Sequence, residues 1–170
     1  RDRGDSCESK ETIDILENCK NLRLKIFDKI RSHNPNFDLH KIRYQNDLPY
    51  LDEQENKLLF ATLKNRDLLE QGFKELKKEE INHEYFGELL NQEHQILRDE
   101  LNISTEKIDS MLSASMDAGA YGGKINGSGG GGCMFAYSPK NPEAVASAIE
   151  SVGGKAYIIG KDEGTKILSK

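Results

Sequence analysis

The feature that most constrains this chain is a glycine-rich stretch in its C-terminal third. Seven of the eleven residues from Gly122 to Gly132 are glycine, and Ser128 is the only other residue between Gly127 and Gly132. Each glycine costs roughly 0.5–1 kcal/mol relative to alanine in regular structure, because it loses more backbone freedom on folding. A run of this kind needs a use that offsets the cost, and the usual one is close approach of the backbone to a ligand.

The residues around the stretch decide between several interpretations of it. A flexible linker is disfavoured, because the dense apolar run at 133–137 follows at once and predicts a buried strand. A Walker A loop would close with Gly-Lys-Ser or Gly-Lys-Thr, and a Rossmann loop would lie between a strand and a helix. The sequence shows neither pattern. The stretch therefore predicts a backbone nest for phosphate oxygens, or a surface against which another loop packs.

Apolar residues at three- and four-residue intervals predict four helices before the glycine stretch. The expected helices span about 10–32, 53–78 and 81–102, and a fourth begins at 104. The apolar faces expected for the first two are Ile13, Leu16, Cys19, Leu22, Ile26 and Ile30 in the first, and Leu59, Leu63, Leu69, Phe73 and Leu76 in the second. Segment 33–50 contains two prolines and is expected to be a connection. His94 lies on the apolar stripe of the third helix. Ser104 is expected to supply the N-cap of the fourth, where a Ser or Thr hydroxyl can accept an unpaired backbone N–H.

After Gly119 the pattern changes to short elements. Residues 133–138 predict a buried strand, and 141–154 predict a helix with Pro142 in its first turn. Two more strands are expected at 155–161 and 165–168. These elements predict an α+β fold, either a β–α–β unit with a glycine loop or helices packed on a small antiparallel sheet.

Composition excludes several classes of protein. Hydrophobic residues make up 36% and charged residues 31%, a balance typical of a globular protein. The net charge of −5 is spread without a basic stripe, so nucleic acid is not expected as a partner. No apolar run suits a membrane span or a secretory signal, so we expect a cytoplasmic protein without a membrane partner. The three cysteines lack a CxxC arrangement and predict reduced thiols, with no metal site.

Residues 122–133 resemble the third signature motif of the GHMP kinases. In that motif a basic, an apolar and a small polar residue lead into a glycine-rich run that ends in cysteine. Lys124, Ile125 and Asn126 occupy those three positions, and the glycines and Cys133 follow. The upstream helices resemble the galactokinase branch at these residues: Phe86, Gly87, Leu89, Leu90, Asn91, His94, Leu97, Arg98, Asp99, Ser104, Ile108 and Asp109.

The resemblance implies that residues 1–170 form the ferredoxin-like C-terminal domain of a two-lobed enzyme. It implies that the glycine loop packs against the nucleotide phosphate loop of the N-terminal domain through these residues: Gly127, Ser128, Gly129, Gly130, Gly131 and Gly132. Lys124 and Asn126 are candidates for contact with substrate or phosphate, with a solvated or lobe-bridging Lys124 as the alternative.

No catalytic residue is assigned within the chain. His94 fits a core or lobe-interface histidine better than a catalytic one, because it lies on an apolar stripe. Arg98 and Asp99 are explained by an ion pair or a helix-end contact as well as by substrate binding. A lobe separated from its partner should also leave an apolar patch beside the glycine loop.

The resemblance further implies an ATP-dependent sugar kinase whose missing domain binds ATP and Mg²⁺. The family's phosphate loop, Pro-x-x-x-Gly-Leu-Gly-Ser-Ser-Ala, does not occur here, nor do its catalytic aspartate motif and its N-terminal sugar-binding motif. Phosphoryl transfer depends on positioning and electrostatic stabilisation, so this lobe alone is expected to be inactive. The expected partners are the chain's own N-terminal domain, ATP and a small-molecule sugar.

The sequence alone does not identify the substrate. Galactokinases carry a tyrosine and paired arginines shortly after an Asn/Asp-Ser pair, whereas here only Arg23 lies near, following Asp5-Ser6. This difference counts against galactose. Other substrates of the family are a heptose phosphate, arabinose and mevalonate. From a different class, the chain could be a free-standing ferredoxin-like module that binds a small acidic ligand.

Overall fold

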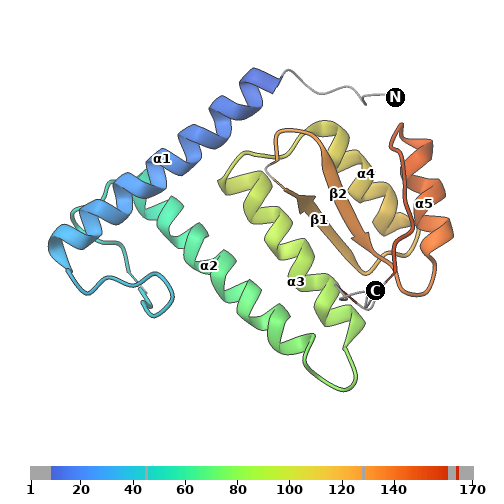
Figure 1. The fold of residues 1–170 in the computed structure, drawn as a ribbon, viewed down its shortest axis with the longest axis horizontal. Helices are drawn as coiled ribbons and strands as arrows, with labels where there is room; N and C mark the ends of the chain where they lie inside the picture. Colours follow the sequence, from blue (N-terminus) through green and yellow to red (C-terminus); the bar gives the residue numbers. More distant parts are fainter. Residues whose placement is uncertain (1–8, 45, 128, 161–163, 165–170) are drawn as a thin grey trace, which may run out of the picture.

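The chain folds as helices packed on a small antiparallel β-hairpin (Figure 1). The structure is a computed structural model and describes residues 9–44, 46–127, 129–160 and 164. In chain order its elements are α1 (Ser9–His33), α2 (Glu53–Glu75), α3 (His83–Gln95), the π-helical segment η1 (Ile96–Glu100), α4 (Glu106–Asp117), β1 (Gly122–Asn126), β2 (Cys133–Tyr137) and α5 (Pro142–Ser151). The predicted α+β class is confirmed.

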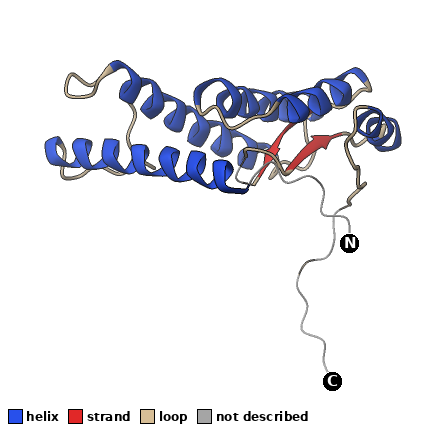
Figure 2. Ribbon diagram, turned by 90° about the horizontal axis from the view of Figure 1, so that it is seen from above, coloured by secondary structure: helices blue, strands red, loops and turns tan. Residues whose placement is uncertain are grey.

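The hairpin contains one strand that the sequence pattern did not reveal. β1 takes up the first part of the glycine-rich stretch and pairs antiparallel with β2, with Gly122 opposite Tyr137 and Asn126 opposite Cys133. The β–α–β alternative needs a strand after α5, and the described residues after α5 form none, so the structure shows the small antiparallel sheet. Figure 2 shows the hairpin at one end of an elongated helical body.

The core lies where α1, α2, α4 and β1 meet. Ile26, Ile30, Leu59, Ile108 and Ile125 come from these four elements and are at most 2% exposed. The stripe predicted for the first helix is therefore confirmed at its C-terminal half. Its earlier members Ile13, Leu16 and Cys19 have side chains outside the described residues, and Leu22 is 41% exposed.

The third helix does not continue regularly to Asn102 as predicted. α3 ends at Gln95, and the next turn is π-helical, with the Leu101 N–H bonded to the Ile96 carbonyl at 3.1 Å. Asn102 then takes a positive φ of 50° and turns the chain. The expected cap also moves by one residue, because Thr105 accepts the N–H of Ile108. The Ser104 hydroxyl is engaged elsewhere.

The predicted strand at 155–161 is not formed in its described part. Residues 154–160 run without a strand ladder, and Tyr157 and Ile159 are 72% and 83% exposed. An apolar alternation predicts a strand only where a neighbouring strand can pair with it, and the described sheet consists of β1 and β2. The strand expected at 165–168 lies outside the described residues.

Candidate functional site

The loop between β1 and β2 can be built only from glycine at most of its positions. The φ angles of Gly127, Gly129, Gly130, Gly131 and Gly132 are all positive, between 67° and 121°. Residues with a Cβ rarely adopt these angles, because the side chain collides with its own backbone. Ser128 lies outside the described residues. The conformation explains the glycine content as a requirement of a specific turn, which a flexible linker would not impose.

One side of the glycine loop rests on the turn that follows η1. The Gly130 N–H donates a hydrogen bond of 2.8 Å to the Ile103 carbonyl. A Cβ built on Gly129 would lie 2.8 Å from both the Cβ and the carbonyl oxygen of Ile103, so this contact also demands glycine. Gly129 and Ile103 are both buried. The loop is thus fixed to the domain at its centre.

The two ends of the glycine loop are open. Gly127 and Gly132 are exposed, and no described atom lies within 4 Å of the position that a Cβ would take on either residue. Another chain segment or a ligand can therefore approach the backbone at these points. The arrangement combines a fixed centre with accessible ends, as a backbone surface for close contact requires.

The two charged or polar candidates before the loop have different environments. The Lys124 Nζ lies 2.5 Å from Oε1 of Glu93 in α3, and both side chains are about one-fifth exposed. This ion pair joins β1 to α3 and occupies the charge that was a candidate for phosphate contact. Asn126 is exposed at the end of β1, next to the loop.

A second close contact of backbones joins α3 to β1. A Cβ on Gly87 would lie 2.2 Å from the Tyr121 carbonyl oxygen, and a Cβ on Gly122 would lie 2.0 Å from the Gly87 carbonyl oxygen. Asn91, one turn later in α3, accepts the Gly123 N–H at 3.0 Å and donates to the Tyr121 carbonyl at 3.5 Å. Its side-chain amide therefore pairs with backbone groups along β1, and α3 holds the hairpin that carries the glycine loop.

A polar cluster connects α3 with the start of α4. Oδ1 of Asp109 is 3.1 Å from Nε2 of His94 and accepts the Ser104 hydroxyl at 2.6 Å. His94 is 7% exposed, so the expectation of a core position agrees with the structure. The apolar stripe located His94 and the capping pattern located Ser104, whereas Asp109 was found only through the family resemblance. Spacing alone could not have predicted that the three side chains meet.

Arg98 and Asp99 bind each other. Nε of Arg98 donates to one carboxylate oxygen of Asp99 at 2.7 Å, and the guanidinium reaches the other at 3.2 Å. This bidentate hydrogen bonding raises the pKa of Arg98 and lowers that of Asp99. Both side chains are about half exposed, so the pair matches the ion-pair interpretation.

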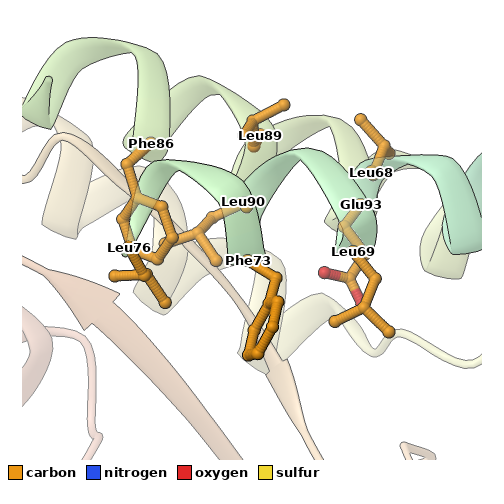
Figure 3. Close-up of a pocket in the computed structure, with 9 residues that line it drawn as sticks. Leu68, Leu69, Phe73, Leu76, Phe86, Leu89, Leu90 and Glu93 are labelled. Carbon is orange, nitrogen blue, oxygen red and sulfur yellow. The ribbon is translucent and has the colours of Figure 1, made fainter. Parts of the chain in front are cut away.

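The exposed apolar patch does not include the glycine loop, contrary to expectation. Leu69 and Phe73 of α2, and its C-cap residue Leu76, are more than half exposed, although a helical stripe predicts that such residues face the core. They line a groove between α2 and α3, with Phe86 and Leu90 on the α3 side (Figure 3). The groove is almost wholly apolar, and Glu93 is the charged residue at its wall.

The described residues form neither a cluster of metal ligands nor a membrane-spanning helix. Among them, no group of three or more His, Cys, Asp or Glu side chains could hold a metal ion. The helices in the same part of the chain are all too short or too polar to cross a membrane.

Comparison with known proteins identifies the larger part of the chain. Residues 69–158 match the family model described as GHMP kinases C terminal. The mevalonate kinase of Thermococcus gammatolerans is 44% identical over 81 residues, which is 48% of this chain and 24% of that protein. Human galactokinase is 32% identical over 88 residues, which is 49% of this chain and 22% of that protein. The chain thus spans about a quarter of the length of the curated relatives it matches.

A solved structure has the same fold over nearly the whole chain. The crystal structure of Lactococcus lactis galactokinase complexed with galactose aligns with a TM-score of 0.67 and 20% sequence identity. The alignment covers 88% of this chain and 40% of that chain. It extends the likeness beyond the segment that the family model matches.

Proposed function

Because this chain belongs to the GHMP kinase C-terminal family, we propose that it forms the C-terminal lobe of an ATP-dependent kinase. The enzyme would transfer a phosphoryl group to an alcohol group of a small molecule. The N-terminal ATP-binding domain would lie outside residues 1–170, as the quarter-length match to mevalonate kinase suggests.

The glycine loop is the observation that carries this proposal. Its centre is fixed by the Gly130–Ile103 hydrogen bond, and its ends at Gly127 and Gly132 are open to an approaching backbone. We propose that this surface packs against the nucleotide phosphate loop of the N-terminal domain. The contact would be made mainly by backbone, because the charge of Lys124 is already paired with Glu93.

The lobe would hold the nucleotide phosphate loop in place and would supply no reacting group. ATP would supply the phosphoryl group, and the other domain would hold Mg²⁺. In a reaction governed by positioning, a wall that holds the phosphate loop in place affects the rate directly.

We propose mevalonate as the first substrate to test and a sugar as the second. The mevalonate kinase of Thermococcus gammatolerans shares 44% identity with this chain, against 32% for human galactokinase. The absence of a tyrosine and paired arginines shortly after Asp5-Ser6 points in the same direction. The 32% identity to human galactokinase over 88 residues supports a sugar as the second candidate.

The test is ADP release by the full-length protein with ATP and Mg²⁺, comparing mevalonate, galactose and arabinose. We expect turnover with one of these substrates, with mevalonate giving the highest kcat/KM, and no turnover by the 170-residue chain alone. A gene that encodes no segment with a Gly-Leu-Gly-Ser-Ser-Ala loop, together with specific binding of a small acid by this chain, would instead support a free-standing binding module.

A further inference from the structure

The polar cluster formed by His94, Asp109 and Ser104 joins a buried side chain to a partly exposed one. His94 is buried in α3, whereas the Asp109 side chain is 35% exposed and lies in the first turns of α4. Replacing such a polar group by apolar residues of similar shape often stabilises a protein, so burial of a hydrogen-bonded pair is weak evidence for a role in stability. A role in fixing one conformation is the alternative.

The cluster is connected to the glycine loop through a short series of contacts. Asp109 holds the hydroxyl of Ser104, and the preceding residue, Ile103, accepts the N–H of Gly130. Ile103 also fills the space beside Gly129 that a Cβ would need. A member of the polar cluster, Ser104, and the residue that supports the loop, Ile103, are therefore adjacent in sequence.

The turn that carries Ile103 has a conformation that its surroundings must hold. It follows a π-helical segment, and Asn102 has a φ of 50°, in the left-handed region that residues with a Cβ adopt only occasionally. Backbone in such a conformation persists only where surrounding contacts hold it. The contacts that do so include the burial of Ile103 in the core, the bond from the Ile103 N–H to the Leu97 carbonyl, and the bond from the Ser104 hydroxyl to Asp109.

The contact with Asp109 also indicates which nitrogen of the His94 ring donates a hydrogen bond. Nε2 faces the Asp109 carboxylate and therefore carries a hydrogen, while Nδ1 is buried with no partner among the described atoms. His94 thus acts as a donor that fixes the orientation of the Asp109 carboxylate.

We propose that His94 and Asp109 are positioning residues for the glycine loop. His94 orients Asp109, Asp109 holds Ser104, and the 102–104 turn then presents the Ile103 carbonyl to Gly130. This inference rests on the proposed kinase function for its catalytic consequence, but the coupling between cluster and loop is a property of this chain alone.

The test uses the full-length protein without nucleotide and measures hydrogen exchange in peptides that cover 127–132. In Asp109→Ala, we expect at least tenfold faster exchange in the loop, with α1 and α5 unchanged within twofold. Ser104→Ala is a milder second variant and should show the same selective effect. Asp99→Asn removes a neighbouring carboxylate that is half exposed, and it should leave loop exchange unchanged.

Steady-state kinetics of the same variants give the catalytic consequence. Asp109→Ala should lower kcat about tenfold and leave the KM of the small-molecule substrate within twofold, because the loop is proposed to act on phosphate positioning. His94→Gln should lower kcat less, since Asp109 can still hold Ser104.

The outcomes separate the two proposals. Unchanged loop exchange in Asp109→Ala, or a rise equal to that in α1 and α5, overturns the positioning role even if the protein is an active kinase. Selectively faster loop exchange in a protein without kinase activity supports the coupling and contradicts the proposed function.

Discussion

The segment that the family model matches, 69–158, and the helical region before it are held together by different kinds of contact. In the earlier region, Ile26 and Ile30 of α1 pack on Leu59 of α2. Several apolar side chains of suitable volume can fill such a core. In the matched segment, α3 touches β1 through Gly87 and Gly122 with no room for a side chain.

The two kinds of contact constrain the sequence differently. Where backbone meets backbone, only glycine satisfies the geometry, so the sequence itself is constrained. Where side chains fill a core, only their volume and polarity are constrained. The likeness of fold extends over 88% of the chain although the family model matches residues 69–158.

The largest effect is expected from Gly87→Ala. Its Cβ would lie 2.2 Å from the Tyr121 carbonyl oxygen, so α3 must move away from β1, and we expect a loss of about 4 kcal/mol or more in the free energy of unfolding. Gly72→Ala is the matched control, because its Cβ meets Phe86 at an ordinary 3.7 Å. It should stabilise α2 by up to about 1 kcal/mol. Equal effects in denaturant unfolding would contradict the comparison.

In the earlier region, the size of the effect should depend on volume and not on residue identity. Leu59→Ala leaves a cavity at a position that is 1% exposed and should cost about 3 kcal/mol. Leu59→Met conserves volume and should cost about 1 kcal/mol. Thermal or denaturant unfolding measures both. A cost for the methionine variant as large as that for alanine would show that this core is as specific as the α3–β1 contact.

A smaller effect is expected where a side chain pairs with backbone groups of β1. Asn91→Ala removes the acceptor of the Gly123 N–H and the donor to the Tyr121 carbonyl, which should cost about 2 kcal/mol. Gln92→Ala, whose partner Glu88 lies on the same exposed helix face, should change stability by less than about 0.5 kcal/mol. If the two variants unfold alike, Asn91 does not hold the hairpin.

The smallest effect expected is a dependence of stability on pH, caused by Glu75 at the end of α2. Lys78 and the Asn82 N–H donate to the Glu75 carboxylate at 2.6 and 2.8 Å, and these hydrogen bonds hold its pKa below the ordinary value of 4.5. The stabilisation is therefore complete above pH 4.5 and lost as the pH falls through the lowered pKa. Glu75→Gln should flatten the fall of the thermal midpoint below pH 4.5, whereas Glu79→Gln should retain the wild-type slope.

Local patterns predicted the helices, and tertiary contacts decided the features that were missed. The 3.6-residue periodicity located α1 to α4 within a few residues, because these helices bury one face. It also assigned Leu69 and Phe73 to the core. Periodicity shows which residues share one face of a helix, but it does not show whether another element covers that face. β1 was hidden because Gly122 and Gly123 have no strand propensity. Tertiary contacts explain them, since a Cβ on Gly122 would meet Gly87 of α3 and one on Gly123 would meet Leu112 of α4 and Phe135 of β2.

The sequence predicted which residues form the candidate site, but it did not predict their contacts. The glycine run indicated a backbone surface, and the resemblance named His94, Ser104 and Asp109. That Ile103 supports the loop, or that Lys124 is paired with Glu93, depends on residues about 25–30 positions apart in sequence. Such contacts follow from the packing of α3, α4 and β1.

The most direct measurement compares Gly132→Val with Gly153→Val in the full-length protein. Both glycines have a φ near 85° and no described atom within 4 Å of a built Cβ, so the intrinsic strain of substitution is matched. Only Gly132 lies in the loop. We predict that kcat/KM falls at least about a hundredfold in Gly132→Val, or roughly 3 kcal/mol of transition-state stabilisation, and stays within threefold in Gly153→Val. Near-wild-type turnover by a folded Gly132→Val enzyme would contradict the role assigned to the loop.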